Sequence, residues 1–334
     1  MNTPQNQSLP GTLGHPAQPY AQPDASAHQG SQQQPGQQAA SPPAPGAQTT
    51  FGVWREWAEM IKIEHTVFAL PFALSGLVLG SRDLPSAAVV LWTILAFTGA
   101  RAAAMTLNRV IDARIDARNP RTSTRAIAQG RIHASKALIF AAFSFALMIF
   151  AASHLPPICL WLSPIAVFWL SFYSYTKRFT WLCHLVLGIA LGGAALGGWI
   201  AVGGQLGEPA PWLLAGAVST WVSGFDIIYA CQDTEFDRSE KLFSLPAAFG
   251  LKSALAISSA LHVLTVASLV ALGAALALGI PYWGGVLLVA VMLGWEHSLV
   301  TPTDLSKVNP AFFNVNGCIS IAAFLAILAD KLVA

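Results

Sequence analysis

Long apolar runs recur along most of this chain, and they constrain its fold more than any other feature. A helix needs about 20 apolar residues to cross the hydrocarbon core of a bilayer, and there it satisfies its own backbone hydrogen bonds. Only 10% of the 334 residues are charged, against about a quarter in soluble domains. We therefore expect an all-α polytopic membrane protein. Nine candidate spans follow one another, at residues 65–80, 86–107, 134–153, 157–175, 181–201, 211–231, 252–276, 278–296 and 311–333.

The chain changes character near residue 50. Residues 1–50 are rich in Gln, Pro, Ala, Ser and Gly and contain no Lys or Arg, so they cannot bury enough apolar surface to fold. We expect a disordered cytoplasmic tail there and a membrane domain over residues 51–334. The domain begins with Trp54, Trp57 and several charged side chains, which is typical of an amphipathic helix at a membrane surface. The first span is short, and we expect Pro71 to interrupt it.

The basic residues predict how the chain is oriented in the membrane, because Lys and Arg collect in cytoplasmic loops. If residue 51 lies inside, 16 of the 18 Lys and Arg fall on the cytoplasmic side, and only Arg82 and Lys331 fall outside. The sequence therefore predicts an inner (plasma) membrane protein with a cytoplasmic N-terminus and an external C-terminus. Two long inner loops, at residues 117–135 and 238–251, are where function is expected to reside.

The first of two acidic motifs ends the second apolar run. Asn108, Asp112 and Asp116 are spaced by four residues, so a helix projects them from one face. Arg101 precedes Asn108 by seven residues and falls on the same face. A single Asp-x-x-x-Asp pair at a helix end could equally be a solvated terminus.

The second motif repeats this plan at the end of the sixth run, where Asp226, Asp233 and Asp237 are spaced by seven and four residues. Four carboxylates on two short helical faces can approach one another only if cations lie between them, because like charges in a dry site repel. Mg²⁺ is the natural occupant, since it prefers oxygen ligands and shares its shell with substrate phosphates. Two motifs in matching positions argue against solvated helix ends and suggest an internal duplication. Such a duplication would place the acidic faces across a central cavity.

Other charged side chains suggest what the cavity binds. Arg101 and Asp226 lie within apolar runs, where an ionisable group is costly and usually faces a cavity or a partner. We expect them to pair or to line one pocket, unless they snorkel to the interface. Cations near Mg²⁺-binding carboxylates suit a diphosphate, although basic residues in cytoplasmic loops need no ligand to explain them. The candidates at the inner mouth are Arg121, Arg125, Arg131, Lys177 and Arg178, of which Arg125 and Lys177 are favoured.

A diphosphate site at the mouth of an apolar cavity fits a ligand with a diphosphate head and a hydrocarbon tail. Loss of an allylic diphosphate creates a carbocation, which the site must shield from water. Aromatic rings can stabilise a cation through their π faces, although packing is the commoner role of any one ring. The candidates for this role are Phe172, Tyr173, Tyr175 and Tyr229.

Four motifs resemble those of the UbiA family of intramembrane aromatic prenyltransferases: NRVIDARID, RTSTRAIAQG, YSYTKRFTWLCH and FDIIYACQDTEFD. The similarity covers residues 55–334 and implies the family's nine helices around a central cavity. Within the family, the sequence looks most similar to bacterial 4-hydroxybenzoate polyprenyltransferases, including a subgroup of the futalosine route to menaquinone. The resemblance implies Mg²⁺-dependent transfer of a polyprenyl group from polyprenyl diphosphate to an aromatic acceptor. It favours 4-hydroxybenzoate as acceptor, in ubiquinone or menaquinone biosynthesis.

The resemblance also implies roles for individual residues. The Mg²⁺ ligands would be Asn108 and four catalytic aspartates, Asp112, Asp116, Asp233 and Asp237. Arg125 and Lys177 would contact the diphosphate. The remaining substrate-binding candidates are Arg101, Arg121, Tyr173, Asp226 and Tyr229. The family's first motif commonly reads Asn-Asp-x-x-Asp, whereas Arg109 here replaces the first Asp, which removes one carboxylate and favours the futalosine-like subgroup. Released diphosphate and Asp116 are candidates for the base that removes the ring proton.

Other interpretations stay open at this stage. The acceptor could be a futalosine-derived or naphthoate intermediate, haem or a phospho-sugar. A transporter could use Arg101 and Asp226 to carry an ion, but transporters bind near the midplane at broken helices, whereas these acids cluster at one membrane face. The expected partners are the donor, the acceptor and the lipid bilayer, and no nucleic acid. The four cysteines have neither metal-ligand nor disulfide spacing.

Overall fold

The structure is a computed structural model that describes residues 50–62 and 66–334. Helices joined by loops make up this part of the chain, so the predicted all-α class is confirmed. The predicted tail lies outside the described residues except for Thr50, and the division of the chain near residue 50 stays a prediction.

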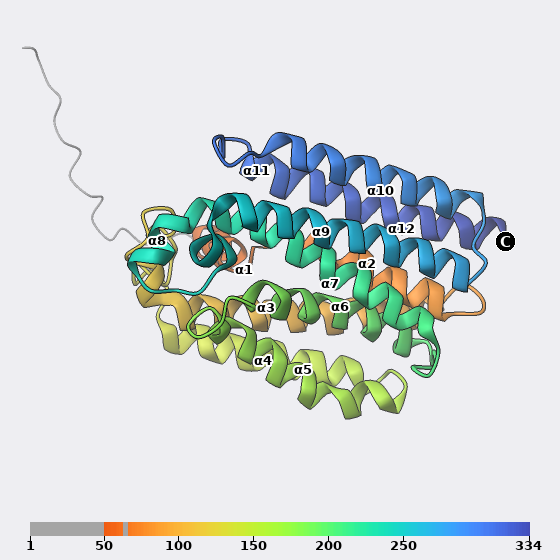
Figure 1. The fold of residues 1–334 in the computed structure, drawn as a ribbon. Coiled ribbons are helices and arrows are strands. Elements are labelled where there is room, and N and C mark those ends of the chain that lie inside the picture. The colour runs from red at the N-terminus through yellow and green to blue at the C-terminus, as the bar shows by residue number, and fades with distance from the viewer. Residues whose placement is uncertain (1–49, 63–65) are drawn as a thin grey trace, which may run out of the picture. The chain divides into compact units, whose positions relative to one another are not determined.

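The long helices lie where the sequence predicts spans, and they run alongside one another (Figure 1). They are α2 (Thr66–Gly80), α3 (Ala87–Asp116), α4 (Ala134–Ala152), α5 (Pro157–Thr176), α6 (Cys183–Ala201), α7 (Pro209–Ala230), α9 (Leu245–Ala275), α10 (Ile280–Leu299) and α12 (Asn316–Val333). Within the described residues, seven helical stretches are long and apolar enough to cross a membrane. Neither α2, which is shorter, nor α10 is among the seven, so the count of nine spans stays a prediction.

Short helices flank these long ones. They are α1 (Thr50–Ile61), the 3₁₀ segment η2 (Cys231–Asp233), α8 (Thr234–Ser239), α11 (Val308–Pro310) and the π-helical segment η3 (Ala311–Val315). The amphipathic segment predicted near residue 54 forms α1. Its Trp57 ring packs 5.0 Å from the Phe140 ring, and its Glu56 carboxylate accepts from Arg131 at 3.0 Å. These contacts hold α1 against the start of α4 and the loop before it.

One expectation about the first span is wrong, because α2 continues through Pro71 instead of breaking there. Pro71 is the sixth residue of α2, so its missing N–H removes a single backbone hydrogen bond near the helix start. The Ser75 hydroxyl donates to the Pro71 carbonyl at 2.8 Å one turn later. A proline this close to an N-terminus costs the helix too little to end it.

Small residues allow α2 and α6 to pack closely. A Cβ atom on Gly198 would lie 1.8 Å from the Ala73 carbonyl oxygen, and one on Gly76 would lie 2.0 Å from that of Ala195. Membrane helices associate through such close backbone packing, because burial from lipid gives little hydrophobic gain. On its other side α6 packs against α7, which also packs against α9. The largest fully buried side chain of α7 is that of Trp221, which is 1% exposed.

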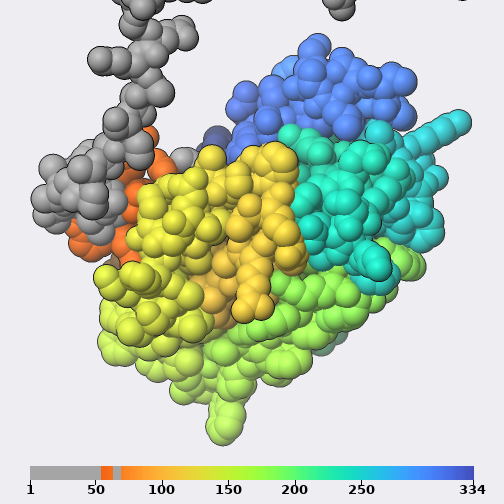
Figure 2. Space-filling model, turned by 90° about the vertical axis from the view of Figure 1, so that its left-hand side faces the viewer, coloured from red at the N-terminus to blue at the C-terminus, as the bar shows by residue number. Residues whose placement is uncertain are grey.

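The long loop predicted at residues 117–135 is present between α3 and α4, at the same end of the helices as α8. The prediction of a long loop at residues 238–251 is wrong, because α8 ends at Ser239 and α9 already begins at Leu245. Figure 2 views this end, with the loop at residues 117–133 in yellow beside the η2–α8 segment in teal. Two glycines at this end have positive φ, Gly130 in the loop after α3 with φ 73° and Gly250 inside α9 with φ 80°. Gly250 interrupts α9 with a kink after its first turn.

Candidate active site

A polar pocket of about 320 Å³ lies at the end of the bundle where the acidic motifs occur. Asn108, Asp112 and Asp116 reach it from the last turns of α3. Asp233 reaches it from η2 and Asp237 from α8. The two motifs, 121 residues apart between Asp112 and Asp233, therefore line one pocket.

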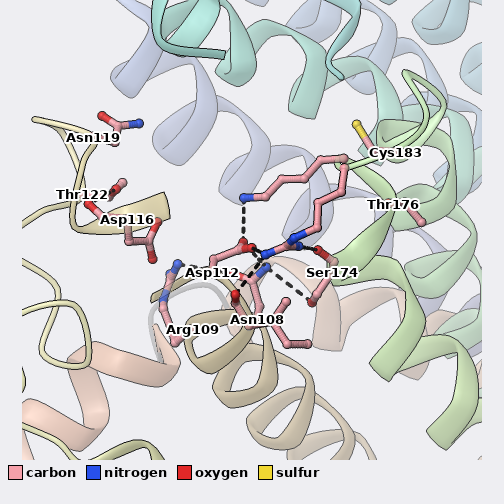
Figure 3. Close-up of polar contacts among 12 residues, drawn as sticks. Asn108, Arg109, Asp112, Asp116, Asn119, Thr122, Ser174, Thr176 and Cys183 are labelled. Atoms are coloured by element: carbon pink, nitrogen blue, oxygen red, sulfur yellow. Dashed lines mark hydrogen bonds and ion pairs between the residues drawn. The ribbon is translucent and has the colours of Figure 1, made fainter. Parts of the chain in front are cut away.

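Asp112 is 1% exposed and is surrounded by cationic and amide groups. Its Oδ2 lies 2.6 Å from Lys177 Nζ, and its Oδ1 lies 3.0 Å from Arg178 Nη2. The Asn108 amide nitrogen donates to Asp112 Oδ2 at 3.1 Å and lies 3.4 Å from Ser174 Oγ. Figure 3 shows Asn108 and Asp112 on α3 with Ser174 facing them from α5. Such partners offset the cost of burying a carboxylate.

Asp116 is held by the loop that follows it. The Arg125 Nη1 atom lies 2.7 Å from each carboxylate oxygen of Asp116. The Thr122 hydroxyl donates to the Asp116 backbone carbonyl at 3.2 Å. These bonds fold the loop at residues 117–133 back over the end of α3, which brings its basic residues to the pocket.

Asp233 is bound by the same loop and not by its own segment. Arg121 donates through Nε to Asp233 Oδ1 at 2.9 Å and through Nη2 to the other oxygen, and Asn119 donates to Oδ1 at 3.0 Å. Arg121 Nη1 also donates to the Tyr229 hydroxyl at 2.7 Å. Burial alone would lower the pKa of Arg121, but its hydrogen bond to Asp233 and the negative groups nearby outweigh burial and raise that pKa. The loop of the first motif is thus bonded to the second motif.

Arg101 and Asp226 line the same pocket, but the ion-pair partner of Asp226 is another residue. His184 Nδ1 lies 2.7 Å from Asp226 Oδ2. The Leu245 backbone N–H donates to His184 Nε2 at 3.3 Å, so the proton of a neutral ring lies on Nδ1 and is donated to Asp226. Arg101 Nε is buried and has no hydrogen-bond partner among the described residues. Arg101 thus lines the pocket while one donor of its guanidinium group is unsatisfied.

An apolar cavity of about 440 Å³ adjoins the polar pocket. Side chains of α3, α4, α5 and α6 line it, and nearly all are apolar. Arg101, Met105 and Tyr173 line both spaces, so the two meet at that level. Tyr173 is kept there by a hydrogen bond from its hydroxyl to the Ala104 carbonyl at 3.3 Å.

The oxygen donors of the polar pocket fit Mg²⁺ in kind, because they include five carboxylates and the side-chain carbonyl of Asn108. Among the described residues, no three His, Cys, Asp or Glu side chains are grouped closely enough to hold a metal ion. The physical reason is that Arg and Lys side chains lie between the carboxylates and neutralise them, as Arg121, Arg125 and Lys177 do. The donor set therefore suits the metal, and cationic side chains take its electrostatic role in this structure.

Of the four aromatic candidates, Tyr173 and Tyr229 line the polar pocket, whereas Phe172 and Tyr175 line neither space. Helical periodicity explains the difference, since residues one and two positions from Tyr173 point to other faces of α5. Tyr175 is 47% exposed, and its ring lies 5.5 Å from the Arg178 guanidinium. Phe172 and Tyr175 are thus unsuited to shield a cation in the pocket.

Sequence reasoning missed several residues that line or support the pocket. Arg109 is 7% exposed and lies 3.4 Å from the Asn108 carbonyl oxygen, through Nη1. Trp221 and Phe225 line the pocket from α7, and their four-residue spacing to Tyr229 is a signal that could have revealed them. Arg131, a candidate for the mouth, is instead paired with Glu56 outside the pocket lining. The other residues missed in the lining are Lys62, Asn119, Thr122, Ser174, Cys183 and Phe312.

Known proteins resemble this chain in sequence. Residues 69–318 match the UbiA prenyltransferase family. A protein of Photobacterium profundum named protoheme IX farnesyltransferase is 32% identical over 176 residues, 51% of this chain and 54% of that protein. One of the same name from Azotobacter vinelandii is 35% identical over 50% of this chain and 57% of its own, so the chain spans about half of these relatives. A 4-hydroxybenzoate octaprenyltransferase of Yersinia pseudotuberculosis is 27% identical over 84% of this chain and 97% of its own.

Solved structures resemble the fold. An apo structure of a UbiA homolog from Aeropyrum pernix K1 has a TM-score of 0.74 and 37% identity, covering 80% of this chain and 98% of its own. A UbiA homolog from Archaeoglobus fulgidus bound to DMAPP and Mg²⁺ has a TM-score of 0.66 and 19% identity. The match covers 84% of this chain and 100% of that homolog. The second likeness shows a shared fold alone.

Proposed function

This chain belongs to the UbiA prenyltransferase family, and from that premise we propose that it transfers a polyprenyl group from polyprenyl diphosphate to an aromatic acceptor, with Mg²⁺. The observation that carries the proposal is that the charged pocket and the apolar cavity meet at Arg101 and Tyr173. The pocket offers carboxylates and cations for the head of the donor, and the cavity offers an apolar space for its tail. The Archaeoglobus fulgidus homolog bound to DMAPP and Mg²⁺ supports this arrangement.

The pocket residues divide into a metal-binding set and a phosphate-binding set. Asn108 and the four aspartates Asp112, Asp116, Asp233 and Asp237 would hold Mg²⁺, which when bound neutralises the diphosphate and favours its departure. Arg121, Arg125 and Lys177 each pair with an aspartate now, and each would turn to the phosphate oxygens when the donor binds. Because each cation would exchange an aspartate for a phosphate oxygen, it would stay paired with an anion before and after the donor binds.

The reaction is an electrophilic substitution. The bond between the allylic carbon and the diphosphate oxygen breaks, and the diphosphate leaves with the electron pair. The ring carbon ortho to the acceptor's phenol forms the new carbon–carbon bond, and its proton then goes to a base. Tyr173 and Tyr229 would border the cation, and the apolar lining would exclude water. Asp116 would hold Mg²⁺ in this proposal, which favours the released diphosphate as the base.

We propose 4-hydroxybenzoate as the acceptor, as a step of ubiquinone or menaquinone biosynthesis. The unsatisfied Arg101 side chain would bind its carboxylate at the deep end of the pocket, and a single ring suits a pocket of about 320 Å³ that also receives a diphosphate. The similarity to proteins named protoheme IX farnesyltransferase favours protoheme as a second candidate. A futalosine-derived or naphthoate acceptor is a third.

The location follows from the helices and the charges. Seven membrane-length helical stretches in the described residues make the chain a multi-pass membrane protein. We propose that it lies in the inner (plasma) membrane with the N-terminus and the pocket mouth cytoplasmic and the C-terminus outside. The supporting observation is that basic loops surround the pocket mouth.

The decisive experiment uses membranes of an expressing strain, labelled 4-hydroxybenzoate, a polyprenyl diphosphate and Mg²⁺, scored for lipid-extractable label. Parallel reactions contain protoheme or a dihydroxynaphthoate. We expect label in lipid that requires the donor and disappears with EDTA. If the enzyme prefers protoheme or the dihydroxynaphthoate, that compound replaces 4-hydroxybenzoate as the proposed acceptor. Absence of prenyl transfer to all three compounds would contradict the proposed function.

The metal assignment is tested in the same assay. Asp112→Asn and Asp233→Asn each remove a charge that Mg²⁺ needs, so we expect turnover to fall by about 100-fold or more while the protein stays folded and membrane-inserted. Size-exclusion chromatography in detergent checks the fold. Retained Mg²⁺-dependent prenylation in either variant would count against the assignment.

A further inference from the structure

Glu296 is a fully buried carboxyl group that takes no part in the pocket lining. It lies on α10 with 0% exposure. Its Oε1 accepts a hydrogen bond from Asn316 Nδ2 at 2.7 Å, and its Oε2 has no hydrogen-bond partner among the described residues. The nearest basic atom is His262 Nδ1, 3.8 Å from Oε2. An acid inside a membrane protein is costly, so its presence calls for a function.

The bonds of Glu296 lead to the pocket through Asn316. Asn316 Oδ1 accepts from the Trp221 indole Nε1 at 2.8 Å, and Trp221 lines the polar pocket. An indole N–H can only donate, so it fixes which end of the Asn316 amide faces it. The amide N–H groups then point to Glu296 Oε1 and to the Ala311 carbonyl, 3.2 Å away. Each bond in this chain therefore determines the orientation of the next.

Trp221 and Arg101 both line the polar pocket, and each lies well before the acidic motif that follows it in the chain. Trp221 precedes Asp233 by 12 residues, which is about 18 Å along a helix, and Arg101 precedes Asp112 by 11 residues, about 16 Å. The Trp221 ring is packed 4.7 Å from the Phe72 ring and 4.8 Å from the Phe225 ring. Because Arg101 and Trp221 line one pocket at similar distances from the acidic motifs, an acceptor bound there can contact both.

The backbone just before Asn316, which accepts the Trp221 hydrogen bond, departs from regular α-helix. The π-helical segment η3 ends immediately before Asn316, and such segments are frequent at functional sites. Phe312 of η3 lines the polar pocket, while Asn316 points to Trp221. A second bond ties the same tryptophan to α9, because His262 Nε2 lies 3.2 Å from the Trp221 carbonyl.

We propose that Glu296 and Asn316 are positioning residues that hold the Trp221 indole ring against the aromatic acceptor. This inference rests on the proposed function. In the proposal Trp221 contacts the acceptor ring, and Glu296 acts only through Asn316. Loss of either bond would leave the indole free to tilt, so the acceptor ring would meet the allylic carbon in a poorer geometry.

Steady-state kinetics of purified protein with the acceptor that wild type uses tests the proposal. We expect Trp221→Phe, Asn316→Leu and Glu296→Leu to lower kcat about tenfold, with the KM for polyprenyl diphosphate changed less than twofold. Glu296→Gln keeps an oxygen that accepts from Asn316 and should restore kcat to within twofold of wild type. Trp199→Phe is the matched control, because Trp199 is 3% exposed, donates to the Gln205 carbonyl and lines neither space.

A double-mutant cycle separates positioning from general destabilisation. If Asn316 acts through Trp221, then Asn316→Leu should cause no further loss of kcat in the Trp221→Phe background. Fully multiplicative losses, or a kcat of Asn316→Leu within twofold of wild type, would overturn the proposal. Thermal unfolding of each variant in detergent shows whether a loss of kcat accompanies a loss of fold.

A spectroscopic measurement tests the chain of bonds without turnover. In protein with ¹⁵N-labelled indoles, the N–H resonance of Trp221 is identified by its absence in Trp221→Phe. We expect Asn316→Leu and Glu296→Leu to move it and Glu296→Gln to leave it near its wild-type position. An unmoved resonance in both leucine variants would overturn the inference even if prenyl transfer is found. Failure of wild type to transfer any prenyl group would contradict the proposed function alone.

Discussion

Charged residues of the polar pocket differ in whether they already have partners. Asp112, Asp116 and Asp233 each form an ion pair with a cationic side chain, whereas Arg101 Nε has no hydrogen-bond partner among the described residues. A buried donor left without a partner costs about 1–3 kcal/mol. A ligand carboxylate that satisfies it would recover that free energy on binding. Arg101 is thus the residue of the pocket with most to gain from an anionic acceptor.

Replacing Arg101 should therefore weaken acceptor binding selectively. We expect Arg101→Gln to raise the KM for 4-hydroxybenzoate by about 10-fold to 100-fold, since a charge-assisted hydrogen bond contributes about 1.5–3 kcal/mol. The KM for polyprenyl diphosphate should stay within twofold of wild type. Initial rates at varied concentrations of each substrate provide the measurement.

The matched control for this change is Arg238→Gln, because Arg238 pairs with the exposed Glu235 and lines neither space. It should leave both KM values unchanged. A rise in the KM for the donor instead of the acceptor would assign Arg101 to the diphosphate and remove the basis for an acidic acceptor.

Helical periodicity made some residues of the polar pocket predictable from the sequence, but not others. The four-residue spacing of Asn108, Asp112 and Asp116 predicts one helix face, and all three line one pocket. The bond from Asn119 to Asp233 crosses 114 residues and depends on how a loop folds back, which no local pattern encodes. The sequence thus indicates which residues share a face, but not which side chains from elsewhere meet them.

At the scale of elements, close packing between α2 and α6 depends on single glycines. A Cβ at position 198 would lie 1.8 Å from the Ala73 carbonyl oxygen, which is backbone and cannot rotate away. We expect Gly198→Ala to push α2 from α6 and to destabilise the protein by about 1–3 kcal/mol. A thermal unfolding scan in detergent should show a lower Tm.

The neighbouring glycine supplies the control. A Cβ at Gly197 meets no atom within 4 Å, so Gly197→Ala should leave the Tm unchanged or slightly raised, because alanine favours a helix. Equal Tm values for Gly197→Ala and Gly198→Ala would contradict the close packing of α2 and α6.

The elements themselves were largely predictable, because each long helix overlaps one of the predicted apolar runs. Pro71 was misjudged, since its effect depends on how near it lies to a helix start, and sequence patterns locate helix ends poorly. The kink at Gly250 likewise depends on one residue with φ 80° inside a continuous apolar pattern. Propensity identifies a helix more readily than it identifies the point where the helix bends.

At the scale of the whole molecule, the two acidic motifs meet because of where they stand in the succession of helices. Asp112 follows the second predicted span and Asp233 follows the sixth, so both fall at the same end of an alternating bundle. This much follows from counting apolar runs. The network of Trp221, Glu296 and Asn316 does not, because its members come from three helices and share no spacing.

The same alternation predicts which end of the bundle faces the cytoplasm, since the predicted topology assigns 16 of the 18 Lys and Arg to the side with the acidic motifs. In a variant without the four native cysteines, Glu208→Cys lies between α6 and α7 and should react with a membrane-impermeant maleimide in intact cells. Gln129→Cys, in the loop after α3, should react only after lysis. Labelling of both variants in lysed membranes controls for accessibility. The reverse pattern in intact cells would place the pocket mouth outside, where a donor made in the cytoplasm could not reach it.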